Sequence, residues 1–193
     1  MRKSLILIFL VSVMACNSSK KATSKASEKF TVESLENMNA RDLKSQYPDA
    51  NIKEGSGLFE EGTEERAYSI LYPETSDELH ITWKDAARTE ILDIRFAEEG
   101  KWKSKSGIKV GTSYEELNKI NEKTISFYGF GWDYSGAVLW NNGELENSGL
   151  RVFLSPEQAP ENKFIGDQII EPSPEEIKML NLRVSSIIIN YAN

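Results

Sequence analysis

The stretch Leu79-His80-Ile81-Thr82-Trp83 decides the fold class, because its apolar residues occupy every second position. Side chains of a strand point alternately to its two faces, so this alternation predicts a β-strand with one buried face. Similar apolar stretches lie on either side of it, at 66–72 and 91–96, and turn-like segments separate the three. The sequence therefore predicts neighbouring strands of an antiparallel sheet.

Short helices are expected before and after these strands. Each predicted start combines a side chain that caps the helix with an acid three residues later, which satisfies backbone N–H groups that a helix leaves free. The last start also carries Pro174 at the first helical position, where its missing N–H costs nothing. The starts are Asn39 with Asp42, Thr112 and Ser113 with Glu115 and Glu116, and Ser173 with Glu176.

The order of elements repeats along the chain. Further strands are predicted at 125–128, 137–140, 150–154 and 184–191, so 39–97 and 112–191 each contain a helix followed by about four strands. We therefore predict an α+β fold, with one antiparallel sheet and short helices on one face. The pattern favours two tandem helix-plus-four-strand units in a single domain over 30–193. The alternative is chance agreement among short elements, since the loop near 156–172 has no counterpart in the first unit.

The amino terminus predicts export and a lipid anchor. Arg2 and Lys3 precede an apolar stretch at 5–13, which matches a secretory signal peptide and is shorter than the roughly 20 residues of a membrane span. The motif Val13-Met14-Ala15-Cys16 resembles the bacterial lipobox, in which the cysteine is acylated and becomes the first mature residue. We expect a signal peptide over 1–15, a lipid on Cys16 and a flexible tether over 16–29. The alternative is an ordinary signal peptide followed by an incidental cysteine.

This anchor predicts where the protein works. A multi-acyl lipid, palmitate included, holds a chain firmly on a membrane. We expect attachment to the bacterial cell envelope at the outer membrane, and the absence of acidic residues just after Cys16 favours a position that faces the periplasm.

Composition excludes several classes of function. Loss of Arg2 and Lys3 with the signal peptide leaves 21 of 23 basic residues against 30 acids, so the net charge moves from −7 to −9, which repels nucleic acid. Cys16 is the only cysteine, and His80 is the only histidine and is expected to face away from Leu79, Ile81 and Trp83. We therefore predict no metal site, no cofactor and no catalytic residue.

The densest segment of the chain is Phe127-Tyr128-Gly129-Phe130-Gly131-Trp132-Asp133-Tyr134-Ser135-Gly136, shortly before Trp140. Glycines allow tight turns and aromatic rings supply flat contact area, so the segment is typical of a stacking surface for a peptide or a sugar. The alternative is structural, with glycines in a bulge or hairpin and the rings in the core. The candidate binding residues are Phe130, Trp132, Asp133, Tyr134 and Trp140.

The run Gly107-Ile108-Lys109-Val110-Gly111-Thr112-Ser113, together with 127–136, resembles a group of uncharacterised bacterial envelope lipoproteins, over roughly 102–154. More loosely, the pattern is similar to the small outer-membrane-assembly lipoproteins and the tandem β-lactamase-inhibitor fold. The resemblance implies a non-catalytic module that binds or assembles with another envelope protein. The alternative function is binding of carbohydrate or peptidoglycan through the aromatic segment, or weak glycosidase activity. For such activity Asp133 and Asp167 would be the catalytic carboxylate pair, and their carboxyl groups would have to lie about 5 to 9.5 Å apart.

Overall fold

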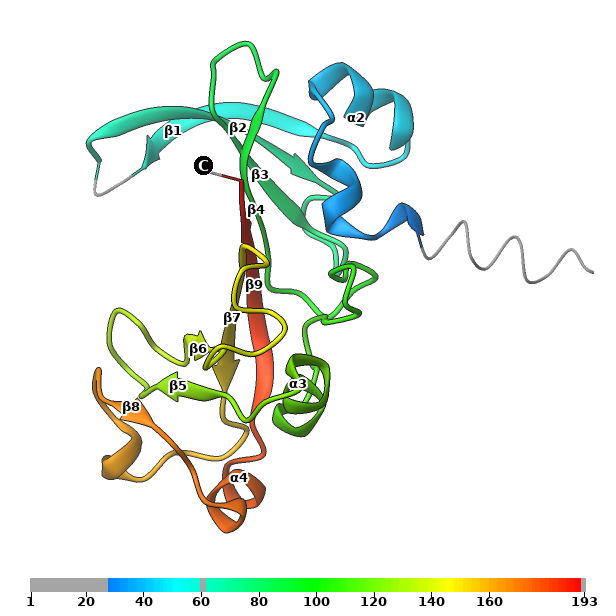
Figure 1. Ribbon diagram of the computed structural model, residues 1–193. Helices are drawn as coiled ribbons and strands as arrows, with labels where there is room; N and C mark the ends of the chain where they lie inside the picture. The colour runs from blue at the N-terminus through cyan, green and yellow to red at the C-terminus, as the bar shows by residue number, and fades with distance from the viewer. Residues whose placement is uncertain (1–27, 60–61, 192–193) are drawn as a thin grey trace, which may run out of the picture.

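The computed structural model describes residues 28–59 and 62–191 (Figure 1). The predicted signal peptide, Cys16 and nearly all of the predicted tether lie outside the described residues. The elements are η1 (Val32–Leu35), α2 (Ala40–Gln46), β1 (Lys53–Phe59), β2 (Glu64–Leu71), β3 (Leu79–Trp83), β4 (Ile91–Phe96), α3 (Tyr114–Asn121), β5 (Ser126–Tyr128), β6 (Val138–Leu139), β7 (Leu150–Ser155), η2 (Asn162–Phe164), β8 (Ile169–Ile170), α4 (Pro174–Leu180) and β9 (Arg183–Asn190).

The strands of the described chain form two antiparallel sheets. A six-stranded sheet has the order β1-β2-β3-β4-β9-β7, and a three-stranded sheet has the order β6-β5-β8. Figure 1 shows α2 and α3 on the same side of the larger sheet, with α4 beyond its end. The predicted α+β class with short helices beside an antiparallel sheet is confirmed.

The two predicted units meet through their last strands. In the first unit β1, β2, β3 and β4 pair in chain order, and β4 then pairs with β9, which in turn pairs with β7. The β4–β9 register aligns Ile94 with Ile189 and Phe96 with Ile187, so apolar side chains of the two units face the same core. This pairing is long-range, because its partners, from Phe96 with Ile187 to Asp93 with Asn190, are 91 to 97 residues apart in the sequence.

The expectation of one continuous sheet is wrong, because the strands of the second unit are divided between two sheets. The six-stranded sheet ends at β7, and β5, β6 and β8 belong to the smaller sheet. Only an isolated bridge, between Ala137 and Phe153, links β6 to β7. Gly136 next to it has φ +71°, and a Cβ there would collide with the carbonyl oxygen of Leu154. Glycine lets the backbone lie this close to β7, and Leu154 N–H donates to the carbonyl of Gly136 at 2.8 Å. Beyond this contact, β5 and β6 form their own sheet with β8, which the long loop supplies.

The three helix starts form the capping boxes that the sequence predicts. In each one the cap side chain accepts from the backbone of the third helical residue, whose carboxylate accepts from the backbone N–H of the cap. Ser173 N–H, for example, donates to Glu176 at 2.8 Å. A cap of this kind contributes about 1 kcal/mol, so helices as short as these gain much from it.

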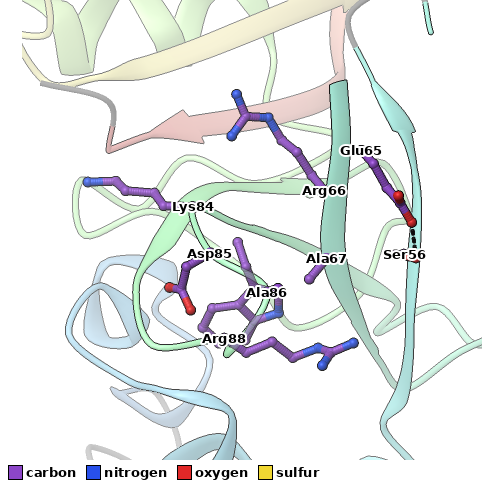
Figure 2. Close-up of a pocket in the computed structure, with 9 residues that line it drawn as sticks. Ser56, Glu65, Arg66, Ala67, Lys84, Asp85, Ala86 and Arg88 are labelled. Carbon is purple, nitrogen blue, oxygen red and sulfur yellow. Dashed lines mark hydrogen bonds between the residues drawn. The ribbon is translucent and has the colours of Figure 1, made fainter. Parts of the chain in front are cut away.

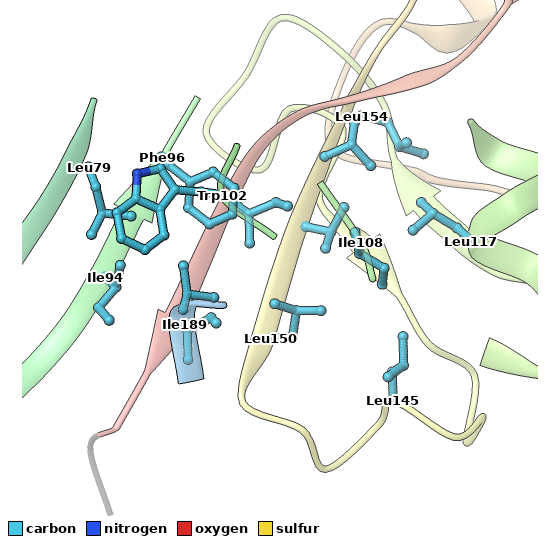
Figure 3. Packing of buried hydrophobic residues seen from close by; sticks show 14 of the residues in the cluster. Leu79, Ile94, Phe96, Trp102, Ile108, Leu117, Leu145, Leu150, Leu154 and Ile189 are labelled. Atoms are coloured by element: carbon cyan, nitrogen blue, oxygen red, sulfur yellow. The ribbon is translucent and has the colours of Figure 1, made fainter. Parts of the chain in front are cut away.

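One hydrophobic core serves both units. Figure 3 shows its side chains running from Leu79 and Ile94 through Ile189 and Leu150 to Leu117 of α3. Trp102, in the segment that connects the units, lies within it at 2% exposure, and its indole N–H donates to the carbonyl of Asp77 at 2.8 Å. The core is therefore closed by a residue outside every helix and strand.

The folded part begins slightly earlier than predicted. Lys29, which the sequence analysis assigned to the tether, has its carbonyl oxygen bonded by the hydroxyl of Tyr47 at 2.6 Å. The ring of Phe30 lies edge-on against Trp102, with centroids 5.0 Å apart. Aromatic contacts from both sides thus hold the first described residues onto the core.

We expect Trp102→Ala to lower the free energy of unfolding by about 3–5 kcal/mol, because it removes a large buried ring and leaves a cavity. Trp132→Ala is the matched control, since Trp132 is 62% exposed, and its effect should stay within about 0.5 kcal/mol. Urea denaturation followed by circular dichroism measures both. Equal losses for the two variants would contradict this account of the core.

Candidate functional site

Four large apolar side chains gather at the surface of the three-stranded sheet. Their exposed fractions are 62% for Trp132, 53% for Tyr134, 40% for Ile165 and 54% for Ile169, and we call these four residues the aromatic patch. Elsewhere in the described chain only Leu58 and Met179 are large, apolar and exposed. Scattered apolar residues are normal on a surface, whereas several on two adjoining loops mark an interaction site.

Backbone hydrogen bonds fix the loop that carries Trp132 and Tyr134. Its ends are joined by Tyr128 N–H to the carbonyl of Ala137 at 2.9 Å and by Gly136 N–H to the carbonyl of Tyr128 at 3.1 Å. Within it, the carbonyl of Trp132 accepts from Ser135 N–H at 3.0 Å, and that of Tyr134 accepts from Ala137 N–H at 2.8 Å. The two rings thus stand on consecutive tight turns, and the patch is presented by a defined backbone.

The second loop of the patch is bonded along the first. Phe130 N–H donates to the carbonyl of Phe164 at 2.7 Å, and Gly166 N–H donates to the carbonyl of Phe130 at 3.0 Å. The approach is so close that a Cβ on Gly129 would collide with the carbonyl oxygens of Phe164 and Gly166. Because glycine alone fits there, Ile165 is held beside the turn that carries Trp132.

The structure separates the five candidate binding residues into two groups. Phe130 and Trp140 lie in the core at 6% and 7% exposure. Phe130 packs on Phe127 with ring centroids 5.5 Å apart, and the indole N–H of Trp140 donates to the carbonyl of Leu150 at 3.0 Å. Their side chains are therefore not available to a ligand, which corrects their assignment as binding residues.

The other three candidates, Trp132, Asp133 and Tyr134, are exposed on one turn. Tyr134 also contacts Tyr128, with ring centroids 5.2 Å apart. Ile165 and Ile169 were not among the predicted binding residues, since an isoleucine in a long loop gives no sign of where it lies. The neighbouring Gly166-Asp167 turn was the signal available, because it marks a place where the backbone folds sharply.

An ion pair between Lys163 and Glu176 connects the second loop of the patch to α4. Lys163 Nζ lies 2.6 Å from a carboxylate oxygen of Glu176 and 4.9 Å from the ring centroid of Phe164. This ammonium, together with the backbone N–H and the hydroxyl of Ser173, lowers the pKa of Glu176 to about 2. The same pair raises the pKa of Lys163. The charges therefore join η2 to the first turn of α4.

The uncovered face of the larger sheet carries polar groups that are already paired. His80 is exposed, as predicted, and its Nε2 lies 2.7 Å from a carboxylate oxygen of Glu78. Arg95 donates to both carboxylate oxygens of Asp93, at 2.9 and 3.2 Å. His80 and Arg95 border two cavities of about 280 and 270 Å³. Because His80 and Arg95 are already paired with carboxylates of the same fold, their charges are less available to a ligand than the exposed side chains of the aromatic patch.

A further cavity of about 300 Å³ lies where β2 begins and β3 ends, at the turn that follows Trp83 (Figure 2). Arg66, Lys84 and Arg88 border it, but Figure 2 shows their side chains pointing in different directions. Arg88 donates to the carbonyl of Gly55 at 3.1 Å. Ligand sites use polar groups that converge on one point, and this cavity lacks that arrangement.

The described residues contain no group of three or more His, Cys, Asp and Glu side chains placed to hold a metal ion. Asp133 and Asp167, the predicted carboxylate pair, are both exposed, whereas a general acid depends on a partly desolvated site. Within the same part of the chain, every helix is too short or too polar to cross a membrane.

Comparisons with known proteins leave the function open. No protein-family model matches the chain, and no curated protein matches it. Among solved structures, the chain is similar to the crystal structure of the uncharacterized protein yfeY from Escherichia coli. The identity is 16%, the match covers 76% of this chain and 87% of that chain, and the TM-score is 0.44.

We expect the difference in melting temperature between the wild type and Glu176→Gln to shrink as pH falls from 6 to 2. The pKa of Glu176 lies at about 2 in the fold against an ordinary 4.5, so its stabilising contribution is present above about 4.5 and is lost as pH falls through 2. Thermal unfolding at several pH values measures it, with Glu171→Gln as the control. A difference that stays constant over this range would contradict the ion-pair assignment.

Proposed function

We propose that this protein is a lipid-anchored component of the bacterial cell envelope, and that its folded part binds another envelope protein without catalysing a reaction. The anchor on Cys16 rests on the charged, short apolar and lipobox segments of the amino terminus. The aromatic patch carries the binding part of the proposal, because it places four exposed apolar side chains on two loops that are hydrogen-bonded to each other.

The composition of the patch favours a protein over a glycan. Sugars are held by aromatic faces together with polar side chains, and the exposed rings of Trp132 and Tyr134 meet the first of these needs. Ile165 and Ile169, however, add aliphatic area, against which a sugar hydroxyl would lose its hydrogen bonds to water at a cost in binding free energy. Trp140, which would have completed a three-ring platform, is buried. A partner with apolar side chains satisfies all four patch residues.

The position of the patch suits an anchored protein. Figure 1 shows the described chain beginning beside α2, while β5 and β8 lie at the opposite end of the molecule. A tether on the side of α2 would therefore leave the patch facing away from the membrane. A partner in the periplasm or in another envelope layer then reaches it without competing with the bilayer.

We expect Cys16→Ser to abolish incorporation of radiolabelled palmitate and to move the protein from the membrane fraction to the soluble fraction. The reason is that the anchor depends on the thiol, whereas the folded domain has no membrane-spanning helix among its described residues. Ser18→Ala, two residues downstream, is the control and should keep the label. Palmitate labelling that persists in Cys16→Ser would refute the anchor.

A photo-crosslinking amino acid placed at Ile169 should capture a discrete envelope protein in living cells, and Trp132→Ala should reduce the yield at least about fivefold. The same probe at Leu58, which is 71% exposed on β1, serves as the control for random encounters. Equal crosslinking from the two positions would count against the patch. Retention on muropeptide resin that is lost in Trp132→Ala, with no protein crosslink, would favour the glycan alternative instead.

A further inference from the structure

Four aromatic rings elsewhere in the described chain, those of Phe30, Tyr47, Phe153 and Phe164, have a cation over one face. Lys101 Nζ lies 5.2 Å from the ring centroid of Phe30, and the guanidinium of Arg151 lies 5.9 Å from that of Phe153. Lys163 occupies the same place over Phe164. The face of an aromatic ring carries negative potential, so a cation within about 6 Å stabilises it.

The rings of the aromatic patch have no such partner. Among residues 28–59 and 62–191, no lysine or arginine lies over Trp132 or Tyr134, although indole is the ring that binds cations best. One face of Tyr134 is in contact with Tyr128, and Trp132 stands free at the surface. The patch thus presents two electron-rich rings toward solvent.

Two carboxylates on the same loops add negative charge. Asp133 lies between the two rings in the sequence, and Asp167 lies between Ile165 and Ile169. Both are exposed, and neither makes a hydrogen bond or ion pair with another residue in the described part of the chain. Glu176, on the adjoining helix, is by contrast already paired with Lys163. The patch therefore combines apolar area with unpaired negative charge.

We infer that the partner presents arginine or lysine side chains among its apolar residues, and that this charge is what the patch selects. An arginine is the better fit, because its planar guanidinium stacks on Trp132 while its N–H groups reach Asp133 or Asp167. The apolar neighbours of that arginine cover Ile165 and Ile169. This inference rests on the proposed function, in that it names the chemistry of the protein bound at the patch.

The carboxylates of Asp133 and Asp167 also disfavour a membrane as the surface that the aromatic patch binds. An anionic bilayer attracts basic segments and repels carboxylates, so Asp133 and Asp167 oppose insertion of the patch into a lipid surface. The chain as a whole is also acidic, with a net charge of −7, which favours a basic partner at long range.

The test uses the full chain in a non-ionic detergent and two blocked twelve-residue peptides, one alternating arginine with valine and one alternating glutamate with valine. Trp132 reports binding by its fluorescence, since the other three tryptophans, Trp83, Trp102 and Trp140, are buried. We expect the arginine peptide to bind with a Kd at least about tenfold below that of the glutamate peptide at low salt, and we expect salt to reduce the difference. The double variant Asp133→Asn, Asp167→Asn should lose most of that preference.

A matched variant separates local from general charge. Glu115→Gln with Glu122→Gln removes the same two charges from exposed positions at the two ends of α3 and should keep the preference. Equal affinity of the two peptides, equal effects of the two double variants, or no peptide binding would overturn the inference. Binding to phosphatidylglycerol vesicles that shifts Trp132 fluorescence would overturn it in favour of a membrane. If any of those three peptide results were obtained but the probe at Ile169 still captured a protein in cells, the inference would fail and the proposed function would stand. If the probe captured no protein, both the inference and the proposed function would fail.

Discussion

The antiparallel pairing of β4 with β9 is the constraint on which the rest of the structure depends. It aligns Ile94 with Ile189 and Phe96 with Ile187, and it turns two half-sheets into one six-stranded sheet. Neither half would bury its apolar face fully alone, because a sheet needs a second layer or more strands to close a core. Trp102, in the segment between the units, is buried in the same core and packs against Phe30 and Tyr47.

The candidate site follows from the place where this sheet stops. β7 is the last strand of the larger sheet and meets the chain before β6 only at an isolated bridge, so β5 and β6 form a small sheet with β8 instead. The two loops of that sheet are bonded to each other through Phe130, so a short element at the end of the molecule presents a fixed surface. Loops on a rigid scaffold are where binding residues are usually found.

The contrast between two surfaces indicates where the function lies. On the open face of the larger sheet, His80 with Glu78 and Arg95 with Asp93 form pairs within the fold. On the patch, the ring of Trp132 and the carboxylates of Asp133 and Asp167 have no partner among the described residues. A group that is paired internally gains little from a ligand, whereas an unpaired group on an apolar surface gains from burial with a complementary partner.

The sequence by itself determined the local structure of this protein. The capping boxes at Asn39, Ser113 and Ser173 depend on residues three apart, and the alternation in Leu79–Trp83 depends on every second residue, so both could be predicted from neighbours in the chain. The amino-terminal anchor at Cys16 is likewise a local pattern, and it remains a prediction from sequence. Tertiary structure alone decided that Trp140 and Phe130 are buried while Trp132 and Tyr134 are exposed, because all four lie within eleven consecutive residues, 130–140, and differ in what packs on them. It also decided that Ile165 and Ile169 complete the patch and that the strands divide into two sheets. These outcomes depend on contacts between distant segments, whose register no local pattern encodes.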